Sequence, residues 1–219
     1  MIKLGNSSFD FDGQQIPDFV ESLSNHQYGK KITLKDTVAS GDYKLLEFSN
    51  GFYAYVSNYI LHQDFELELS VAKEDYLALH INQIKAGTEC NLSLNHQSVS
   101  YGDKIITAIF LTGPKDNFVL SGTSGACVNR LKIMVPKKWV ANHLPSFDIK
   151  LLNTYLEMGK ERFSLDSVDT TYRSMVDKVM HTEESAFYLP VTENILTVIT
   201  ERFFNRLRTK LQKDQHSMN

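Results

Sequence analysis

The sequence predicts an α+β fold, in which a β-sandwich or a closed β-barrel is followed by about three α-helices. Two observations carry this prediction. Up to about Pro145, apolar residues tend to alternate with polar ones, as in strands, whereas after it they recur every three or four residues, as in amphipathic helices. The first half also contains eight or nine short strand-like segments with no helix-length segment between them, which argues against a parallel α/β sheet.

The predicted β half begins with three segments that are rich in β-branched and aromatic residues. Residues 32–36 (ITLKD), 43–48 (YKLLEF) and 52–61 (FYAYVSNYIL) favour strands. The sequences ASGD and SNG, which lie between them, favour turns. The clearest strand covers residues 65–71, in which four apolar residues at every second position point to one side: Phe65, Leu67, Leu69 and Val71.

Four more strands are expected in the rest of this half. The sequence AKED predicts a hairpin turn from residues 65–71 into a strand at residues 76–84. Residues 103–111, 117–122 and 126–136 follow, separated by TGPKDN and GTSG. The segment SGTSGAC superficially resembles a phosphate-binding loop. It lies between two strands rather than before a helix, so a tight hairpin turn is the preferred interpretation.

Three amphipathic helices are predicted after residue 146. The first presents one apolar face made of Ile149, Leu152, Leu156 and Phe163. The second runs through Val168, Tyr172, Met175, Val176 and Val179, with Asp166 as its expected N-cap. The third begins near Pro190 and carries an apolar stripe with a spacing of three and then four residues, formed by Leu196, Ile199, Phe203, Leu207 and Leu211.

Composition narrows the class of protein. The 219 residues carry a net charge of -3, so a nucleic-acid surface over the whole protein is not expected, and the basic cluster of Arg202, Arg206, Arg208, Lys210 and Lys213 is a local feature. Cys90 and Cys127 are too few for a disulfide framework, which favours a reducing compartment. No signal sequence and no membrane-length apolar segment is present, so we expect a cytoplasmic protein without a membrane partner.

No motif for metal binding or catalysis stands out. The seven histidines do not recur at the two-residue spacing that puts two ligands on one strand face. His62 and Glu66 would lie roughly 13 Å apart along one strand face, so only His80 from a neighbouring strand could complete a site. Neither GxSxG nor GxxxxGK[ST] occurs. We therefore predict no catalytic residues, no metal and no cofactor.

The aromatic residues of the β half have two interpretations. Most of them are expected in the core, but some could line a ligand cavity, which a barrel of about eight strands can hold. Tyr53 and Tyr55 share one strand face, and buried tyrosine hydroxyls require hydrogen-bond partners. His80 and Asn82 share a face of another strand and point either to water or into such a cavity. These four residues are the candidate ligand-binding residues.

Three segments resemble the N-terminal regulatory portion of AraC-type transcription regulators. Residues 43–84 (YKLLEF through HINQI) are similar to the family's opening strands. Residues 131–145 (LKIMVPKKWVANHLP) are similar to its last strand and a short helical turn, and residues 188–207 (YLPVTENILTVITERFFNRL) to the helix that precedes the DNA-binding part. The resemblance covers roughly residues 28–212 and rests on the order of elements and the hydrophobic pattern.

This resemblance implies an antiparallel, cupin-like β-barrel (jelly roll) at residues 1–145 that senses an unknown small-molecule effector. It implies a helical region at 146–213 that forms a homodimer, for which Leu196, Ile199, Phe203 and Leu207 are the candidate residues, and residues 214–219 are expected to form a disordered tail. Full-length family members continue into helix-turn-helix units. No such pair fits after Leu211, so DNA would be bound only through a domain that this chain lacks.

Two other functions remain open. A metal-dependent cupin enzyme would need a cluster of metal ligands, and a scaffold domain would have a filled barrel and bind no ligand. The resemblance favours a non-enzymatic effector-sensing domain over both. It names neither the effector nor the target DNA.

Overall fold

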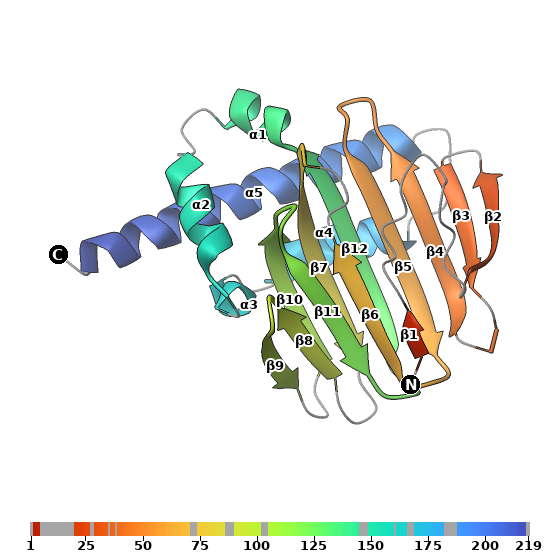
Figure 1. The fold of residues 1–219 in the computed structure, drawn as a ribbon. Coiled ribbons are helices and arrows are strands. Elements are labelled where there is room, and N and C mark those ends of the chain that lie inside the picture. The colour runs from red at the N-terminus through yellow and green to blue at the C-terminus, as the bar shows by residue number, and fades with distance from the viewer. Residues whose placement is uncertain are drawn as a thin grey trace.

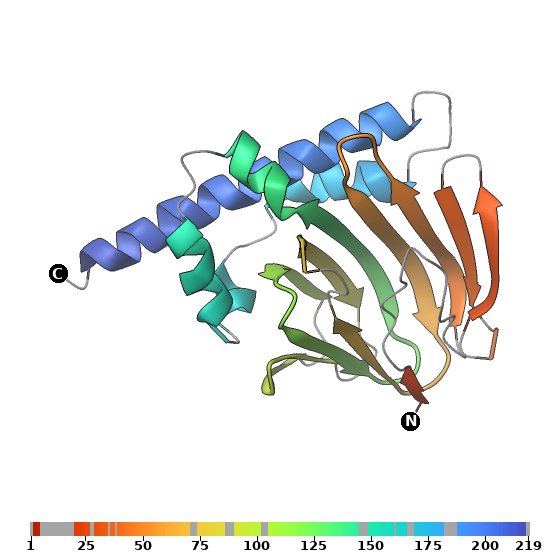
Figure 2. The same ribbon diagram turned by 45° about the horizontal axis from the view of Figure 1, so that its top comes forward.

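The structure is a computed structural model, and it shows a three-layered arrangement of two β-sheets and a layer of helices (Figures 1 and 2). It describes residues 2–4, 20–26, 29–34, 36–37, 39–70, 74–85, 90–101, 105–144, 149–159, 161–165, 169–181 and 188–217. The order of the elements confirms the predicted α+β class, with strands first and helices after them.

The larger sheet has seven described strands, and all of its pairings are antiparallel. Their order across the sheet is β10 (Ile105–Thr112), β7 (Tyr76–Lys85), β12 (Cys127–Pro136), β5 (Tyr53–Leu61), β4 (Ala39–Glu47), β3 (Gly29–Leu34) and β2 (Val20–His26). The strands β5, β12 and β7 at its centre have a burial pattern typical of strands that are covered on both faces.

The smaller sheet has five described strands, in the order β1 (Ile2–Leu4), β6 (Phe65–Ser70), β11 (Asn117–Gly122), β8 (Cys90–Leu94) and β9 (Gln97–Tyr101). Strand β1 runs parallel to β6, and the other pairs are antiparallel. No described strand belongs to both sheets. Of the two expected architectures, the described residues therefore form a β-sandwich and not a closed barrel.

Two turns that the sequence analysis assigned to hairpins instead join strands of different sheets. Strand β6 pairs with β1 and β11, whereas β7 pairs with β10 and β12, so AKED is not the turn of a hairpin. The turn at residues 123–126 likewise leads from β11 into β12 in the other sheet. A third turn was placed wrongly, since ASGD lies inside β4, where Gly41 adopts a φ of 138°. Local sequence indicates where the chain bends but not which sheet the next strand joins.

Five helices are described, one of which is a single turn. They are α1 (Lys137–His143), α2 (Ile149–Glu157), α3 (Arg162–Leu165), α4 (Thr170–His181) and α5 (Tyr188–Ser217). The predicted first helix is thus divided into α2 and α3, and Ile149, expected on its buried face, is 68% exposed. Helix α4 is capped by Asp169, while the expected cap, Asp166, lies outside the described residues. Helix α5 continues to Ser217, so residues 214–217 are helical rather than a disordered tail.

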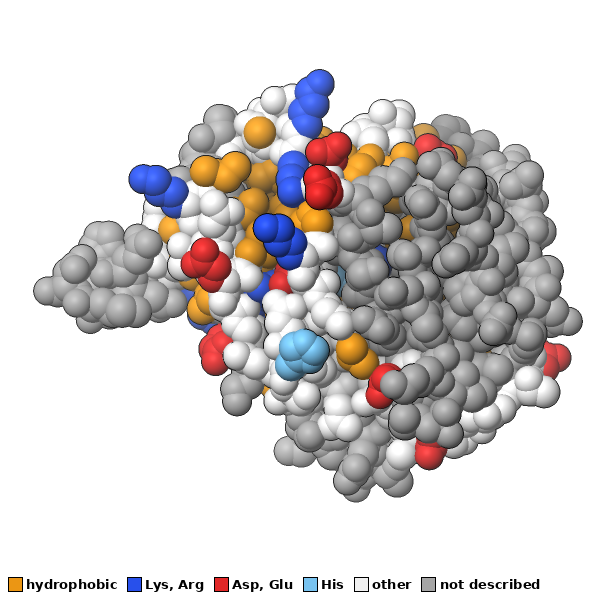
Figure 3. Space-filling model, in the orientation of Figure 1, with side chains coloured by type: hydrophobic (Ala, Val, Ile, Leu, Met, Phe, Trp, Pro, Cys, Tyr) orange, Lys and Arg blue, Asp and Glu red, His pale blue; other side chains and the backbone are white. Residues whose placement is uncertain are grey.

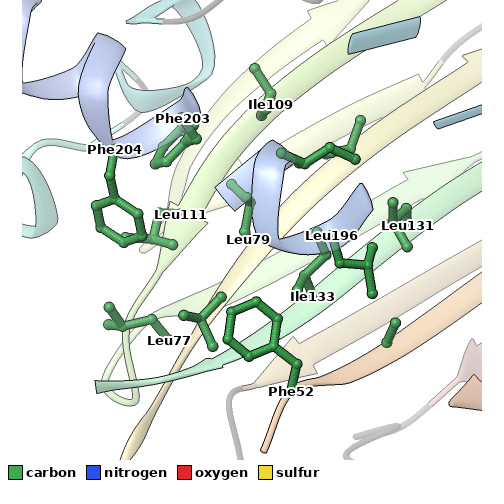
Figure 4. Close-up of a cluster of buried hydrophobic side chains, with 14 of the residues drawn as sticks. Phe52, Leu77, Leu79, Ile109, Leu111, Leu131, Ile133, Leu196, Phe203 and Phe204 are labelled. Carbon is green, nitrogen blue, oxygen red and sulfur yellow. The ribbon is translucent and has the colours of Figure 1, made fainter. Parts of the chain in front are cut away.

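The seven-stranded sheet separates two apolar clusters. One lies between the sheets and includes Phe110 and Phe118. The other lies between the outer face of the seven-stranded sheet and the helices, as Figure 4 shows for side chains of β7, β10 and β12 beneath α5. Leu79, Ile133 and Phe203 meet in this second cluster and are at most 1% exposed.

The apolar stripe of α5 is buried within the chain itself. Leu196, Ile199, Phe203 and Leu207 are at most 5% exposed, because they pack against the sheet and α2. The described side chains of this stripe are therefore covered within the chain itself, and a homodimer through them stays a prediction.

Helices α2 and α3 close the β10 edge of the seven-stranded sheet. The Leu111 amide donates a hydrogen bond to the Tyr155 hydroxyl at 2.9 Å, and the Leu111 carbonyl accepts one from Arg162 at 3.4 Å. Arg162 is fully buried and pairs with Asp116 at 2.6 Å. It also donates to the carbonyls of Leu156 and Met158. This edge is thereby protected from pairing with another strand.

The basic cluster of α5 is partly neutralised within the chain. Asp169 accepts hydrogen bonds from Arg202 at 2.7 Å and Arg206 at 3.2 Å, and both guanidinium groups lie over the ring of Tyr172. On the face that Figure 3 shows, the described Lys and Arg side chains lie among Asp and Glu side chains rather than in one basic area. None of the described helices combines the length and the apolar character that a membrane span requires.

Candidate functional site

Polar side chains project from the centre of the seven-stranded sheet into the space between the two sheets. They come from alternate positions of β4, β5, β12 and β7, because the intervening residues, such as Leu79, Leu131 and Ile133, face the helices. Because successive side chains of a strand point to opposite faces, the polar residues at the other positions point into the space between the two sheets. We call His80, Asn82, Arg130 and Lys132 the interior polar cluster. All four are at most 5% exposed.

The register of the sheet brings these residues together in two adjacent rows. Lys132 on β12 lies directly between Tyr55 on β5 and His80 on β7. Two residues along the chain, Arg130 lies between Ser57 and Asn82. Neighbouring strands are about 4.8 Å apart, so the members of the cluster are close enough to act on one small ligand.

Arg130 reaches across the interior toward the smaller sheet. Its Nη2 donates to His80 Nδ1 at 3.3 Å, and its guanidinium lies 5.9 Å from the centre of the Phe118 ring on β11. Burial lowers the pKa of Arg130, while three tyrosines, led by Tyr43, oppose that effect. An arginine retains its charge even when its pKa is lowered in this way, so a positive charge lies inside the sandwich.

His80 is held as a neutral imidazole. Arginine only donates hydrogen bonds, so Nδ1 of His80 must accept from Arg130, and Nε2 then carries the proton and donates to Thr112 Oγ1 at 2.8 Å. Burial, and then the charges of Arg130 and Lys132, lower the pKa of His80 well below its ordinary value. Its ring is stacked on Phe110 at 4.8 Å, which fixes its orientation.

Lys132 is the second cation of the cluster. Burial first, and then the charge of Arg130, lower its pKa from 10.5 to about 7. Its ammonium lies 5.1 Å from the centre of the Tyr55 ring. Among the described residues, no ion pair joins Lys132 or Arg130 to an Asp or Glu. Burial of a cation without a carboxylate partner lowers the stability of the folded state, because the desolvation of the charge is not compensated.

Three buried polar atoms of the cluster have no hydrogen-bond partner among the described residues. They are the Nδ2 and Oδ1 atoms of Asn82 and the Nε atom of Arg130, which belong to directly opposed residues of β7 and β12. Most buried polar groups in proteins are hydrogen-bonded, because leaving one unpaired costs about 1–3 kcal/mol. Unpaired donors thus lie beside two buried cations, an arrangement that a bound anion would satisfy.

Tyrosines form the wall of the cluster on the β4 and β5 side. Tyr43 and Tyr55 make an edge-to-face contact at 6.4 Å, and Tyr59 is buried on the same face of β5. Burial raises the pKa of Tyr43 and of Tyr59, while Arg130 opposes both shifts. These phenols therefore stay un-ionised near neutral pH and offer hydroxyl groups and aromatic faces rather than negative charge.

The structure unites three of the four predicted ligand-binding residues. Tyr55, His80 and Asn82 belong to the two rows around Arg130 and Lys132. Tyr53 lies on the same face but at the edge of the interior, half-buried, with its ring 5.7 Å from that of Tyr76. Burial, and then its neighbours Tyr76 and Glu47, raise the pKa of Tyr53 to about 12.

Arg130 and Lys132 were missed from the sequence. In the segment NRLKIMV, alternation alone suggests that Leu131 and Ile133 point to the core and that the cations point to water. The opposite holds, because helices cover the outer face of β12 and the apolar residues pack against them. In β7, likewise, Leu79 and Ile81 pack against the helices, so His80 and Asn82 point between the sheets. Only the pairing of β7 with β12 shows that they lie beside Arg130 and Lys132.

The positive charges of the cluster favour an anion as its ligand. No three His, Cys, Asp or Glu side chains of the described residues lie close enough together to hold a metal ion. Both ring nitrogens of His80 are already engaged, and His62 is exposed in the turn after β5. Two cations with neutral donors around them instead form a site that attracts negative charge.

Comparisons with known proteins leave the family of this chain open. No protein-family model matches it, and no curated protein matches it. It is similar to the Cnp3 cupin domain of Schizosaccharomyces pombe (9% identity, 52% of this chain and 82% of that one, TM-score 0.30). It is also similar to a predicted oxalate decarboxylase of Thermotoga maritima (10%, 52% and 98%, 0.27) and to the vicilin of hazelnut, Corylus avellana (11%, 66% and 42%, 0.29). With such TM-scores these similarities establish neither a family nor an activity.

Proposed function

We propose that this chain is an effector-sensing domain of an AraC-type transcription regulator, in which a cupin-like sandwich binds a small molecule between its two sheets. The interior polar cluster carries the proposal. A domain that served only as a scaffold would gain stability from an apolar interior, whereas this one buries Arg130 and Lys132 without an acidic partner among the described residues. The regulator assignment rests on the resemblance of the sequence.

A route of direct contacts from the cluster to the helices supports a sensing role. The His80 ring is stacked on Phe110, which contacts Phe163 of α3 at 4.7 Å. The preceding residue, Arg162, lies over the ring of Tyr155 on α2, and the centre of that ring is 6.2 Å from the centre of the Phe203 ring on α5. A ligand that moved His80 would therefore disturb side chains that pack on α5, the helix that precedes the DNA-binding part in the family that the sequence resembles.

The proposal includes a homodimer and no catalytic turnover, and DNA would be bound only through a further domain. Polar substitutions at Phe203 and Leu207 would disrupt the helix–sheet core, because both side chains are buried in it. The test of a dimer is therefore sedimentation of the unmodified chain at tens of micromolar. A monomer at that concentration would contradict this part of the proposal.

A thermal-shift screen tests the sensing function. Sugars, aromatic acids and fatty acids are each added to the purified chain, and a ligand at about 100 times its Kd should stabilise it by about 2.7 kcal/mol. Hydrogen exchange with the best compound should then change in α2, α3 and α5. A screen in which no compound of any class stabilises the chain would refute the sensing function.

A further inference from the structure

We propose that the effector is a small organic acid, whose acid group is bound by Arg130 and Lys132 between the two sheets while Asn82 hydrogen-bonds to the same molecule. This inference rests on the proposed sensing function and names the class of its ligand. It excludes a neutral sugar and a cation as the preferred effector. Three properties of the cluster support it: its charge, its unpaired atoms and its aromatic walls.

The charge of the cluster selects an anion. Arg130 and Lys132 occupy alternate positions of β12, so both side chains extend from the same face of one strand, about 7 Å apart at the backbone. The groups that face them are the neutral His80 on β7, the phenols of Tyr55 and Tyr59 on β5 and Tyr43 on β4, and the apolar Phe118 on β11. No described group of this set supplies a negative charge, so a bound acid would complete the ion pairing.

The unpaired atoms give the anion a defined position. Arg130 Nε and Asn82 Nδ2 are donors on directly opposed residues, and the Arg130 guanidinium already uses Nη2 to bond His80. An acid group placed between them would accept from both, and the Lys132 ammonium lies in the next row. Charge-assisted hydrogen bonds of this kind are about twice as strong as neutral ones. Asn82 Oδ1 would accept one further bond from a hydroxyl or amino group of the ligand.

The walls of the cluster indicate a compact apolar or aromatic body. Phe118 lies beneath Arg130 and Tyr55 beneath Lys132, so a flat ligand would contact aromatic faces on both sides of its acid group. Arg130 and Lys132 are 3% and 5% exposed, so the ligand reaches them only when the wall opens. Tyr43 and Tyr53 pack against this interior but are only half-buried, so they are the expected entrance.

Matched acids and amides test this inference. A panel of small carboxylic acids with apolar and aromatic bodies, including benzoate and hexanoate, is compared with the corresponding amides by thermal shift at pH 7. Inorganic phosphate and sulfate form a separate arm. We expect at least one acid to raise the melting temperature of the wild-type chain while its amide does not. Calorimetry should then show roughly 10- to 100-fold weaker binding for Arg130→Met and for Lys132→Met.

Two controls separate the inference from its alternatives. Lys138→Met, which removes an exposed lysine of α1, should leave the acid's affinity unchanged. The affinity of the wild-type chain should fall about fivefold from pH 7 to pH 8, as Lys132 loses its proton, and this fall should be absent in Lys132→Met. Tyr43, Tyr59 and His80 do not change charge over this range, because burial raises the pKa of both phenols and lowers the pKa of His80.

The outcomes are distinguishable. Stabilisation by neutral compounds alone, or by acids equally in the wild type and in both variants, would overturn the acid-binding inference and leave the sensing function standing. Phosphate or sulfate that replaces every organic acid at equal concentration would show that the site takes an inorganic anion, which also overturns it. A panel in which neither acids nor neutral compounds bind would refute the inference and the sensing function together.

Discussion

Removal of the buried positive charge at Lys132 is predicted to stabilise the unliganded protein, most strongly at and below neutral pH. In the folded chain, burial and the charge of Arg130 lower the pKa of Lys132 from 10.5 to about 7. The unfolded state therefore binds more protons between these two values, so stability rises with pH across that window. Each pKa unit corresponds to about 1.36 kcal/mol, so Lys132 costs roughly 4–5 kcal/mol below pH 7, where both states carry the proton.

Part of the stability that the charged Lys132 removes returns when the pH is raised above 7. Between pH 7 and pH 9 the contribution of Lys132 to the free energy of unfolding should improve by about 2 kcal/mol. Lys132→Met keeps an unbranched side chain of similar length but carries no charge, so it should be more stable than the wild type at pH 7. Its advantage should shrink by about 2 kcal/mol at pH 9.

Urea unfolding at pH 7 and pH 9 measures this difference directly, because the midpoint and the slope give the free energy of unfolding at each pH. Other titrating groups are shared by the two proteins and cancel in the comparison. Lys138→Met is the matched control, since its side chain is exposed at the start of α1, and it should follow the wild type. Parallel stability curves for the wild type and Lys132→Met would refute the reasoning.

The remaining predictions concern the contacts that attach the helices to the sheet. Tyr155→Phe should lower the free energy of unfolding by about 1–2 kcal/mol, measured in urea, because it leaves the Leu111 amide without its partner. Asp116→Ala should cost about 3–5 kcal/mol in the same assay, because it removes the carboxylate that pairs with the fully buried Arg162 guanidinium. Asp169→Ala should cost about 1 kcal/mol through loss of the α4 cap. Its wild-type carboxylate has a lowered pKa, chiefly through the Tyr172 amide, so the effect should vanish below that pKa when acid protonates the wild type.

Exposed residues on the same helices provide the controls. Asn153→Ala on α2 and Arg173→Met on α4 change side chains that lie at the surface, so both should stay within about 0.5 kcal/mol of the wild type. A loss in Asn153→Ala as large as that in Tyr155→Phe would show that α2 is sensitive to any substitution rather than to the Leu111 hydrogen bond. A Tyr155→Phe variant as stable as the wild type would contradict the proposed closure of the β10 edge.

Local patterns in the sequence predicted eight of the described strands but not their partners, and they missed β1, β2, β8 and β9. The alternation in residues 65–71 and the spacing of the α5 stripe depend on one element alone, and β6 and α5 lie where these patterns indicate. The choice of sheet does not depend on local pattern. Residues 65–70 and 76–85 read as a hairpin, yet they belong to different sheets, because each strand is paired by segments far away in the chain.

The candidate site was predictable only in part for a related reason. Tyr55, His80 and Asn82 attracted attention because aromatic and polar side chains shared strand faces. Arg130 and Lys132 alternate with apolar residues in the manner of a strand with one solvated face. Their burial follows from the smaller sheet, which covers their face of β12, while the later helices cover the opposite face. When a strand is covered on both faces, its own sequence does not show which face lies between the sheets and which packs against the helices.

The central claim is that Arg130 and Lys132 serve a ligand rather than the fold. The most direct test is the melting temperature of the wild type and of the Arg130→Met/Lys132→Met double variant, each measured alone and with the acid that stabilises the wild type most. We predict that the double variant melts at a higher temperature than the wild type when no ligand is present and that the acid no longer shifts it. A double variant that melts at a lower temperature and still shows the full shift with the acid would contradict the claim.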